Sequence, residues 1–579
     1  MTGEQAKGRS TGGGQTTAMV TTPTPVAVRV DSQASLSEGA EVADLRERRL
    51  FVSLDNERKG YITRQELTRA LACTGLDAKD SRLRECMAGL AALGDSDPID
   101  YDQFCRIVRP NILLIELALQ GNLVIPDFEE FSQEIEQIYQ ETRSVRDGDL
   151  AKYIHQLAAV DPEHYAVALC TIDGQRYETG DSRTDFCVQS CCKPINYCLA
   201  LEEYGEELVH SHVGREPSGH GFNEITLNAA HKPHNPMINA GAIMCCSLIR
   251  QGADMAGRFE HVMERWKSLC GDDKVRFNNS VYLSERATAD RNFALGYFLR
   301  EKHAFPANTD LVATLEFYFQ CCSIEATAAQ LSIVAATLAN GGICPTTGKR
   351  ILQPKTVQHC LSLMYSCGMY DFSGEFAFTI GLPAKSGVSG VLMIVVPNVM
   401  GICTWSPRVD SHGNSVRGLA FCRKLVEKFR FHNYDNLTGL HEKQDPRQSR
   451  IRLDADVVVA LIWAASKGDL SAIQRLVASG TDLNGADYDG RTPLHLAASE
   501  GHEDVVRYFI DQGVNINPVD RWGGTPLCDA QRHGHKVVME LLELAGGTAV
   551  VNRSTDAARD VEQVRAPGRD QGSAWNGIR

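Results

Sequence analysis

The stretch Phe186-Cys-Val-Gln-Ser-Cys-Cys-Lys-Pro194 decides how the middle of the chain is interpreted, because it places Ser190 three residues before Lys193. The apolar run Ile195 to Leu201 follows at once and predicts a helix. On a helix, residues i and i+3 share a face, so the Lys193 amine is within reach of the Ser190 hydroxyl. A serine hydroxyl needs a neighbouring base, and a buried lysine becomes one when its pKa falls. The pattern therefore predicts a serine nucleophile that forms an acyl-enzyme.

A second box further along the chain supports this interpretation. Lys385-Ser386-Gly387 leads into the apolar run Val391 to Val396, which predicts a strand. A lysine–hydroxyl–glycine box of this kind lines the wall opposite a Ser-x-x-Lys pair in the penicillin-recognising hydrolases. The two boxes in this order predict a Ser–Lys hydrolase, but they do not choose its substrate.

Length and charge narrow the class of protein. At 579 residues the chain is too long for one ordinary core, so three or more units are expected. The 59 basic and 73 acidic residues give a net charge of −14, which disfavours nucleic acid or an anionic membrane as the main partner. No run approaches the roughly 18 apolar residues of a membrane span. Nineteen cysteines without a paired C-x-x-C metal spacing favour reduced thiols and predict no metal cofactor.

The N-terminal part divides into two regions. Residues 1–36 are rich in Thr, Gly, Ser and Pro and predict a disordered or targeting segment. Residues 37–144 predict a helical EF-hand-like domain, because Asp55 to Glu66 has the outline of a calcium loop. Lys59 puts a positive charge at the fifth loop position, where calcium needs an oxygen, so we predict no strong calcium binding. The predicted helices are Glu38–Leu54, Arg64–Thr74, Ser81–Leu93 and Asp102–Ile107.

The C-terminal part contains an internal repeat. Gly468, Gly501 and Gly534 are spaced by 33 residues, and Thr-Pro-Leu recurs at 492 and 525 with the same spacing. A 33-residue period with Thr-Pro-Leu-His is typical of ankyrin repeats. We predict the remaining domains as follows: catalytic domain 145–436, linker 437–454, about three ankyrin repeats 455–546, and a disordered tail 547–579.

The catalytic region is expected to mix helices with an antiparallel sheet. Tyr165 to Ile172 and the Asp173-Gly174 turn predict a strand and hairpin, and Val391 to Val396 and Val399 to Trp405 predict two further strands. The fold class is therefore multidomain, with an α/β catalytic domain between two helical modules.

As a whole, the sequence resembles the kidney/liver-type glutaminases of animals, from about residue 40 to 546. That family joins an EF-hand-like region, a serine-dependent, β-lactamase-like glutaminase domain and ankyrin repeats. The resemblance rests on long stretches in the same order. They are Asp173-Gly-Gln-Arg176, Gln189-Ser-Cys-Cys-Lys-Pro194, Glu216-Pro-Ser-Gly219, His234-Asn-Pro-Met-Ile-Asn-Ala-Gly-Ala-Ile243, Asp290-Arg-Asn-Phe-Ala294, Ser366-Cys-Gly-Met-Tyr370 and Gly381-Leu-Pro-Ala-Lys-Ser-Gly387.

The resemblance implies a mechanism. Ser190 would attack the side-chain amide of L-glutamine, ammonia would leave, and water would release glutamate from the acyl-enzyme. Lys193 is implied as the base and Tyr370 as a proton relay. The backbone N–H groups of Ser190 and Val388 are implied to stabilise the oxyanion. Cys191 and Cys192 follow the nucleophile and are expected to pack away from its face.

The resemblance also implies how the amino acid is held. Glu285 would bind the α-ammonium group, Asn239, Asn292 and Tyr318 would bind the α-carboxylate, and Tyr153 would close the pocket. Glu285 and Asn292 are seven residues apart, so on one helix they would share a face. Without the resemblance, each residue has an ordinary structural interpretation, such as a solvated charge for Glu285.

One loop departs from the family. Where mammalian kidney-type members carry Lys-Leu-Phe-Leu, this chain has Glu224-Ile-Thr-Leu227. The family's loop governs tetramerisation and phosphate activation, so inorganic phosphate stays open here as an activator. A homotetramer (dimer of dimers) and a mitochondrial location are implied by the family alone, with a cytosolic location as the alternative.

Two other functions stay open at this stage. The two boxes alone also fit a Ser–Lys hydrolase that acts on another amide or ester. Glu285 distinguishes the two, because Glu285→Gln should impair turnover of glutamine but not of a substrate that lacks an α-ammonium group. The other alternative is an ankyrin scaffold whose middle domain binds a ligand without catalysing a reaction. The ankyrin repeats predict a protein partner without naming it.

Overall fold

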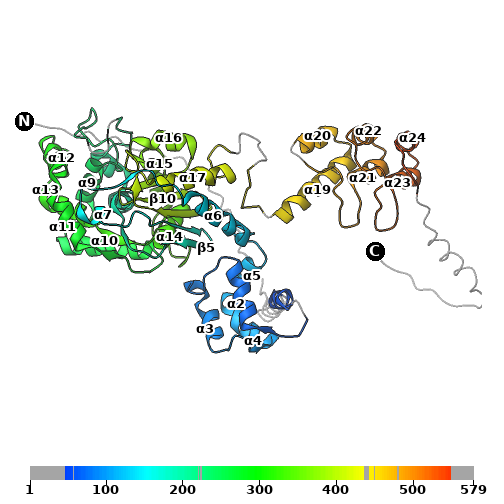
Figure 1. Cartoon of the computed structure of the whole chain (residues 1–579), viewed down its shortest axis with the longest axis horizontal. Helices are drawn as coiled ribbons and strands as arrows, with labels where there is room; N and C mark the ends of the chain where they lie inside the picture. The colour runs from blue at the N-terminus through cyan, green and yellow to red at the C-terminus, as the bar shows by residue number, and fades with distance from the viewer. Residues whose placement is uncertain are drawn as a thin grey trace, which may run out of the picture.

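The computed structural model describes residues 46–55, 58–219, 221, 224–435, 443–448, 450–478 and 481–549. Figure 1 shows an α/β body with a helical module at one side and a separate array of helix pairs towards the C-terminus. The predicted segments 1–36 and, apart from residues 547–549, 547–579 lie outside the described residues, as does the first part of the predicted helix from Glu38. No helix in the described ranges is long and apolar enough to cross a bilayer.

The N-terminal module packs short helices around one small core. Its elements are β1 (Ile62–Thr63), α2 (Arg64–Cys73), α3 (Arg84–Ala91), β2 (Pro98–Ile99), α4 (Tyr101–Val108) and α5 (Ile112–Leu119). Strands β1 and β2 pair antiparallel, and Ile62 and Ile99 lie opposite each other in the core. The predicted helices are confirmed within one to three residues, except that Ser81–Leu83 forms a 3-10 turn before α3.

The loop with the calcium-site outline is held by its own residues. The Asp55 carboxylate accepts the backbone N–H groups of Lys59 and Gly60, both at 2.8 Å. The Glu66 carboxylate caps α2 through the Thr63 N–H (2.7 Å) and pairs with the Lys59 ammonium at 3.2 Å. The first and last carboxylates of the loop, Asp55 and Glu66, are therefore already bound by backbone N–H groups and by Lys59.

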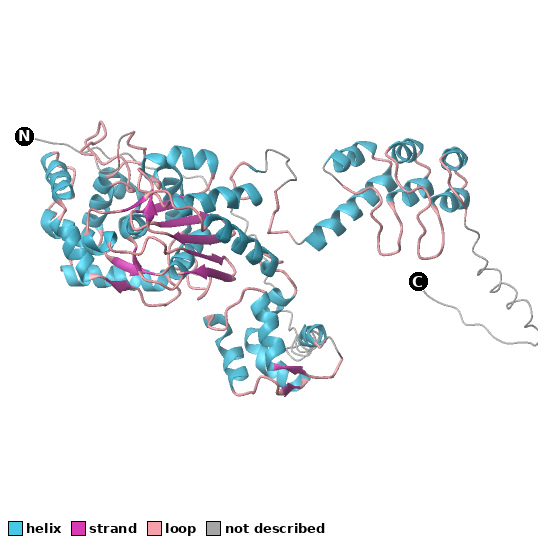
Figure 2. Ribbon diagram, viewed as in Figure 1, coloured by secondary structure: helices cyan, strands magenta, loops and turns pink. Residues whose placement is uncertain are grey.

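A five-stranded sheet forms the centre of the catalytic domain (Figure 2). Its antiparallel order is β5-β4-β11-β10-β9. The predicted strand 391–396 is confirmed as β10, and the other two predicted strands are each shorter at their ends. The strands are β4 (Ala166–Thr171), β5 (Arg176–Gly180), β9 (Ala384–Gly387), β10 (Val391–Val396) and β11 (Met400–Trp405).

Alternating side chains of this sheet enter two different cores. Met393 packs on the side of α14 (Ala328–Ala339), while Ile394 packs on the side of α6 (Phe128–Thr142) and α17 (Val416–Lys428). A Cβ at Gly401 would lie 2.1 Å from the Ala336 nitrogen, so α14 sits directly on β11. Both faces are covered, which explains why β10 reads as a continuous apolar run.

A helical lobe packs on the α14 side. It comprises α7 (His155–Ala158), α8 (Cys192–His212), α9 (Asn239–Leu248), α10 (Met255–Leu269), α11 (Asn279–Ala287), α12 (Asp290–Glu301), α13 (Leu311–Cys322) and α15 (Pro354–Cys367). Helix α16 (Ser373–Thr379) instead packs Phe376 into the core on the α6 and α17 side. The domain also contains a small three-stranded sheet. Its strands, in order, are β6 (Phe186–Cys187), β8 (Ile324–Ala326) and β7 (Arg276–Phe277). The expectation that Glu285 and Asn292 share one helix is wrong, because the chain breaks at Thr288 and Ala289 between α11 and α12.

The N-terminal module is fixed to the sheet at the turn between β4 and β5. Gln175 is fully buried there, and its amide nitrogen donates to the carbonyls of Thr74 and Ile125, both at 2.9 Å. The Arg176 N–H donates to the Gly75 carbonyl at 2.7 Å, and the Arg82 guanidinium donates to the Asp173 carbonyl at 2.6 Å. The Asp173–Arg176 turn therefore belongs to an interface within the chain.

The C-terminal array stacks three helix pairs around its own core. The pairs are α19 (Arg450–Lys467) with α20 (Leu470–Ala478), α21 (Pro493–Glu500) with α22 (Glu503–Asp511), and α23 (Pro526–His533) with α24 (Lys536–Leu544). The repeated glycines Gly501 and Gly534 end α21 and α23 with a φ of 77°. Their left-handed conformation favours glycine and explains the 33-residue signal.

Candidate active site

The candidate nucleophile lies in a strained turn at the start of a buried helix. Ser190 occupies the 3-10 turn Gln189–Cys191 that leads into α8. Gln189 has a φ of 46°, a conformation that is costly for a residue with a side chain and that clusters at functional sites. The Val188 N–H donates to the Ile324 carbonyl at 2.9 Å and fixes the turn to the small sheet. The half-buried Ser190 therefore stands on a rigid support.

Lys193 is fully buried one turn further on. Its ammonium donates to Asn239 Oδ1 at 2.7 Å, at the first residue of α9. Burial lowers the pKa of Lys193 below the ordinary lysine value. The same Asn239 amide meets Tyr318, whose hydroxyl donates to Oδ1 at 3.3 Å, and Asn292, whose Oδ1 accepts from Nδ2 at 3.2 Å. The structure thus brings the predicted carboxylate contacts together beside the candidate base.

Glu285 lies on the other side of the turn, 9% exposed. Its Oε1 accepts the Tyr153 hydroxyl at 2.6 Å and the Gln189 amide at 3.0 Å. Burial raises the pKa of Glu285, and these two hydrogen bonds oppose the rise because they favour the carboxylate. The solvated-charge interpretation of Glu285 is therefore wrong. Its buried carboxylate, with two of its neighbours already donating to it, fits a partner for an ammonium group.

The opposite wall carries Tyr370 and Lys385. Tyr370 is 7% exposed and has a φ of 55°, a second left-handed non-glycine residue at the site. Burial raises the pKa of Tyr370, and the nearby Ser190 side chain opposes the rise. The fully buried Lys385 ammonium lies 4.5 Å from the centre of the Tyr370 ring and donates to the carbonyls of Gly368 (3.0 Å) and Ser386 (2.6 Å). Burial, followed by the nearby Lys193, lowers the pKa of Lys385 to about 7.

A tight turn links the two walls. The Gly390 N–H donates to the Gly387 carbonyl at 2.9 Å, which leaves Val388 at a middle position, outside the turn's own hydrogen bond. A Cβ at Gly387 would lie 3.0 Å from the Val188 carbonyl, so this strand end approaches the chain just before the nucleophile. A Cβ at Gly413 would lie 3.5 Å from both Tyr370 and Val388. Small residues thus let Val388 and Tyr370 face the same space.

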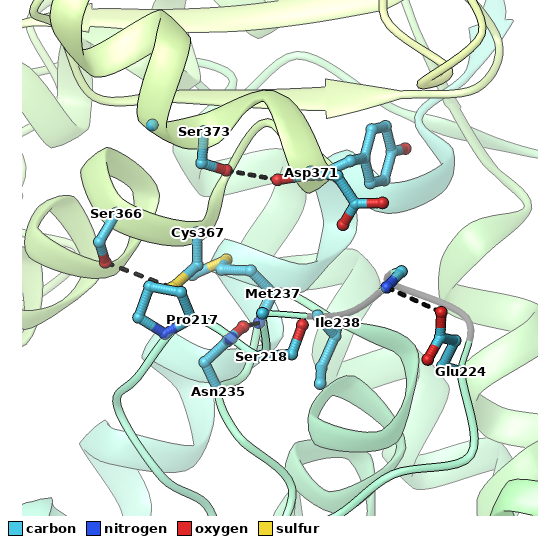
Figure 3. A pocket seen from close by; sticks show the side chains of 14 residues that line it. Pro217, Ser218, Glu224, Asn235, Met237, Ile238, Ser366, Cys367, Asp371 and Ser373 are labelled. Atoms are coloured by element: carbon cyan, nitrogen blue, oxygen red, sulfur yellow. Dashed lines mark hydrogen bonds between the residues drawn. The ribbon is translucent and has the colours of Figure 1, made fainter.

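Figure 3 shows a pocket near Asp371 and Ser373, and Tyr370 is also one of its lining residues. It has a volume of about 590 Å³. The Glu224 carboxylate lies at its edge, where it accepts the Gly221 N–H at 3.3 Å. A Cβ at Gly221 would lie 3.3 Å from Glu224 Oε1 and 3.7 Å from Asp371 Oδ2, so two carboxylates border the opening. The altered loop therefore makes this entrance acidic.

The two cysteines after the nucleophile are buried. Cys191 Sγ contacts the Lys385 carbonyl at 3.3 Å, and Cys192 Sγ lies 3.9 Å from Cys322 Sγ. Burial raises the pKa of both thiols, which keeps them protonated and unreactive. These contacts agree with the packing role expected from the sequence. In the described part of the chain, no cluster of three or more His, Cys, Asp or Glu side chains is arranged to hold a metal ion.

The sequence predicted no role for Gln189 and identified Lys385 only as part of the Lys-Ser-Gly motif. For Gln189, the only indication in the sequence was its position directly before the predicted nucleophile. The contact of Lys385 with the Tyr370 ring joins residues that are 15 positions apart on different elements. A pattern read along the chain does not show such a contact.

Comparisons with known proteins agree with this architecture. The family model described as glutaminase matches residues 148–434, an EF-hand domain model matches 46–126, and a model of three ankyrin repeats matches 461–553. These ranges lie close to the predicted domains.

Individual relatives give the same picture. The liver isoform of mitochondrial glutaminase from Rattus norvegicus is 46% identical over 435 residues, which covers 74% of this chain and 72% of the relative. Putative glutaminase 2 from Caenorhabditis elegans is 50% identical over 397 residues, or 68% of this chain and 66% of the relative. The solved structure of a probable glutaminase superposes with a TM-score of 0.50 and 36% identity, and covers 52% of this chain and 96% of that one.

Proposed function

The chain belongs to the glutaminase family, and we propose that it hydrolyses L-glutamine through an acyl-enzyme on Ser190, with Lys193 as the general base. The observation that carries the proposal is the arrangement around Ser190: a buried lysine one turn away, a buried carboxylate, and a buried tyrosine near the serine. Each group supplies what an amide-cleaving serine enzyme needs.

Acylation follows from these positions. Lys193 in its neutral form takes the Ser190 proton as Oγ attacks the δ-carbon of the amide, and burial favours that neutral form. The carbonyl oxygen becomes an oxyanion that the N–H groups of Ser190 and Val388 stabilise. Tyr370, near Ser190, gives its hydroxyl proton to the leaving nitrogen and takes the proton from Lys193. Ammonia departs as the C–N bond breaks, and Lys193 is neutral again for the second half of the reaction.

Deacylation repeats the same steps with water. Lys193 removes a proton from a water molecule that attacks the ester carbonyl, and the oxyanion again takes the two N–H bonds. The C–O bond to Ser190 breaks, the serine regains its proton, and L-glutamate is released.

Substrate recognition divides between two sides of the turn. Glu285 would pair with the α-ammonium group, with Tyr153 and Gln189 orienting its carboxylate. Asn239, Asn292 and Tyr318 would donate to the α-carboxylate, since all three meet at the Asn239 amide. A substrate without an α-ammonium group would leave the Glu285 carboxylate buried without a cation, which is costly.

The test is ammonia and glutamate release by the purified full-length chain with glutamine, alongside asparagine. We expect turnover of glutamine and none of asparagine. Ser190→Ala should abolish turnover while the far-ultraviolet circular dichroism and melting temperature stay close to those of the parent. Retained turnover in Ser190→Ala would remove Ser190 from the mechanism, and asparagine turnover would show that the substrate assignment is too narrow.

Regulation and assembly complete the proposal. We expect a weak response to inorganic phosphate, because the Glu224 and Asp371 carboxylates at the pocket entrance repel an anion. Glu224→Lys should therefore strengthen the response, and equal phosphate curves for the two proteins would show that this entrance has no part in it. We also propose a homotetramer, which light scattering on the eluted protein would test.

The proposed location is mitochondrial, because the rat relative is named so. Fractionation of cells that express the chain tests it, and a signal in the cytosolic fraction would favour the alternative. We further propose that the ankyrin array holds a protein partner, since such repeats form extended binding surfaces.

A further inference from the structure

A second pocket lies behind the proposed substrate site. It has a volume of about 360 Å³, within the range of small-molecule sites. Its wall comes from α7, β6, the start of α11 and the end of β11. A small apolar cluster of Ile154, Leu157, Cys187 and Val281, with Val388 packed on it, lies next to this pocket. The pocket and the substrate site therefore have neighbouring walls, and they share α11 and the turn that contains Val388 and Ser389.

Two polar atoms of this pocket have no partner among the described residues. The Ser389 hydroxyl is one, on a residue that is 6% exposed and that follows Val388 in the turn. The other is Gln156 Oε1, whose amide nitrogen already donates to the Ser280 carbonyl at 3.3 Å. Leaving a buried acceptor without a donor is costly. A ligand N–H group that reached either atom would remove this cost.

The charge of the pocket is negative. Asp161, Asp185 and Glu325 line it. Arg276 pairs with Asp185 at 2.7 Å, so this cation already has its own carboxylate, and the imidazole of the lining His164 lies 3.1 Å from Asp181. Glu325 Oε1 accepts a neutral donor, the Asn278 amide, at 2.7 Å. Asp161 and Glu325 therefore leave an excess of negative charge.

The rest of the wall is apolar. Leu157, Val160, Phe186 and Val281 line it beside Trp405, which is stacked against Phe186 at 4.8 Å between ring centres. An apolar wall next to excess carboxylate suits a molecule with both an apolar body and a positive charge. We propose that this pocket binds a small organic ammonium ion and thereby regulates the neighbouring substrate site.

The coupling follows from shared elements. Tyr153, which donates to Glu285, lies two residues before α7, and Leu157 of α7 lines the pocket. Val281 lies one helical turn before Glu285 on α11. Ser389 adjoins Val388. A ligand that fixes these three elements alters the affinity for the substrate, and the substrate alters the affinity for the ligand by the same factor.

The test separates binding from turnover. The coupling rests on the proposed function, but binding does not, so the first measurement is calorimetric titration of the full-length Glu285→Gln variant with phenethylammonium chloride. This variant lacks the carboxylate that the α-ammonium group of glutamine would use. Hydrocinnamate and phenethyl alcohol serve as anionic and neutral probes of similar shape. We expect saturable binding of the ammonium probe alone.

A second variant locates the binding. Adding Glu325→Gln should weaken it roughly tenfold, while Glu301→Gln, an exposed carboxylate elsewhere, should leave it unchanged. Three results would each overturn the proposal: no binding, equal binding of the neutral probe, or binding that Glu325→Gln does not weaken. The pocket would then be interpreted as a solvent-filled cavity.

Turnover then tests regulation in the parent protein. We expect phenethylammonium to shift KM for glutamine to a limiting value at saturation, and Glu325→Gln to reduce that shift. Purely competitive inhibition that Glu325→Gln leaves intact would place the probe in the substrate site and overturn the regulatory proposal, although the glutaminase function would stand. If the parent protein shows no glutamine turnover, the proposed function fails, and the binding result is judged separately.

Discussion

The two walls of the candidate active site use the same components in different ways. Each contains a fully buried lysine and a non-glycine residue with positive φ: Lys193 with Gln189 on one wall, Lys385 with Tyr370 on the other. Lys193 donates to a side chain, Asn239, which also belongs to the proposed substrate contacts. Lys385 donates to two backbone carbonyls and covers a ring face.

This difference assigns different tasks to the two lysines. A side-chain amide can rotate when substrate arrives, so Lys193 is able to exchange its partner for Ser190 or water. Backbone carbonyls cannot rotate in that way, so the Lys385 amine keeps its two hydrogen bonds when substrate binds. We infer that Lys193 handles protons, whereas Lys385 holds the Tyr370 turn in place.

The largest expected effect is the loss of the base. Lys193→Met keeps an apolar stem of similar volume and removes the amine, so kcat for glutamine should fall by roughly 10²–10⁴-fold. Steady-state ammonia release measures it. A loss below tenfold would move the base role to another group, with Tyr370 and Lys385 as the nearest candidates.

A smaller loss is expected on the opposite wall. Lys385→Met removes both carbonyl contacts and the charge over Tyr370, and a displaced relay costs up to about 10²-fold in kcat. KM should change little, because the proposed substrate contacts lie on the other wall. The matched control is Lys349→Met, which removes an exposed lysine paired with Asp272 and should leave kcat unchanged. An effect of Lys385→Met on KM alone would contradict the positioning role.

The pH profile sharpens the same comparison. The active form of Lys193 is neutral, so kcat/KM should fall as the pH drops and Lys193 becomes protonated. Because burial lowers the pKa of Lys193, the midpoint of this fall should lie below the ordinary lysine pKa. The groups around Lys193 are the thiols of Cys191, Cys192, Cys246 and Cys322, the Glu285 carboxylate and the Lys385 amine. Where the Lys385 amine is charged, its removal takes away a neighbouring positive charge, so Lys193 should hold its proton to higher pH. In Lys385→Met the acidic limb should therefore move upward, and an unchanged limb would show that the two amines do not interact.

The sequence predicted the elements of this site better than its contacts. Ser190, Lys193 and the box at Lys385 follow from short patterns, since spacing along one helix or strand is local. Strand β10 and the ankyrin pairs were also predictable, because burial on both faces and a 33-residue period leave signals in the residues themselves. The break between α11 and α12 was not, because no proline or glycine marks residues 288 and 289.

The interfaces between domains were equally hidden. Gln175 fits a hairpin turn in sequence terms, but it is buried because the N-terminal module packs over it. Asn239 on α9 likewise contacts Lys193, Tyr318 and Asn292, which come from three other helices. A single sequence contains no information on such pairs except through resemblance to a family.

The smallest expected effect concerns the left-handed residue beside the nucleophile. Asparagine adopts positive φ more readily than glutamine, so Gln189→Asn should relieve the backbone at φ 46° and leave the melting temperature unchanged or about 1–2 °C higher. Its shorter side chain no longer reaches Glu285, whose carboxylate then keeps only the Tyr153 bond. Losing a hydrogen bond to a charged group should raise KM for glutamine roughly tenfold. Gln189→Gly, which relieves the backbone further and also lacks the amide, is the matched control and should show the same KM. A large fall in kcat in both variants would instead show that the strained turn itself aligns Ser190 and that its conformation depends on this side chain.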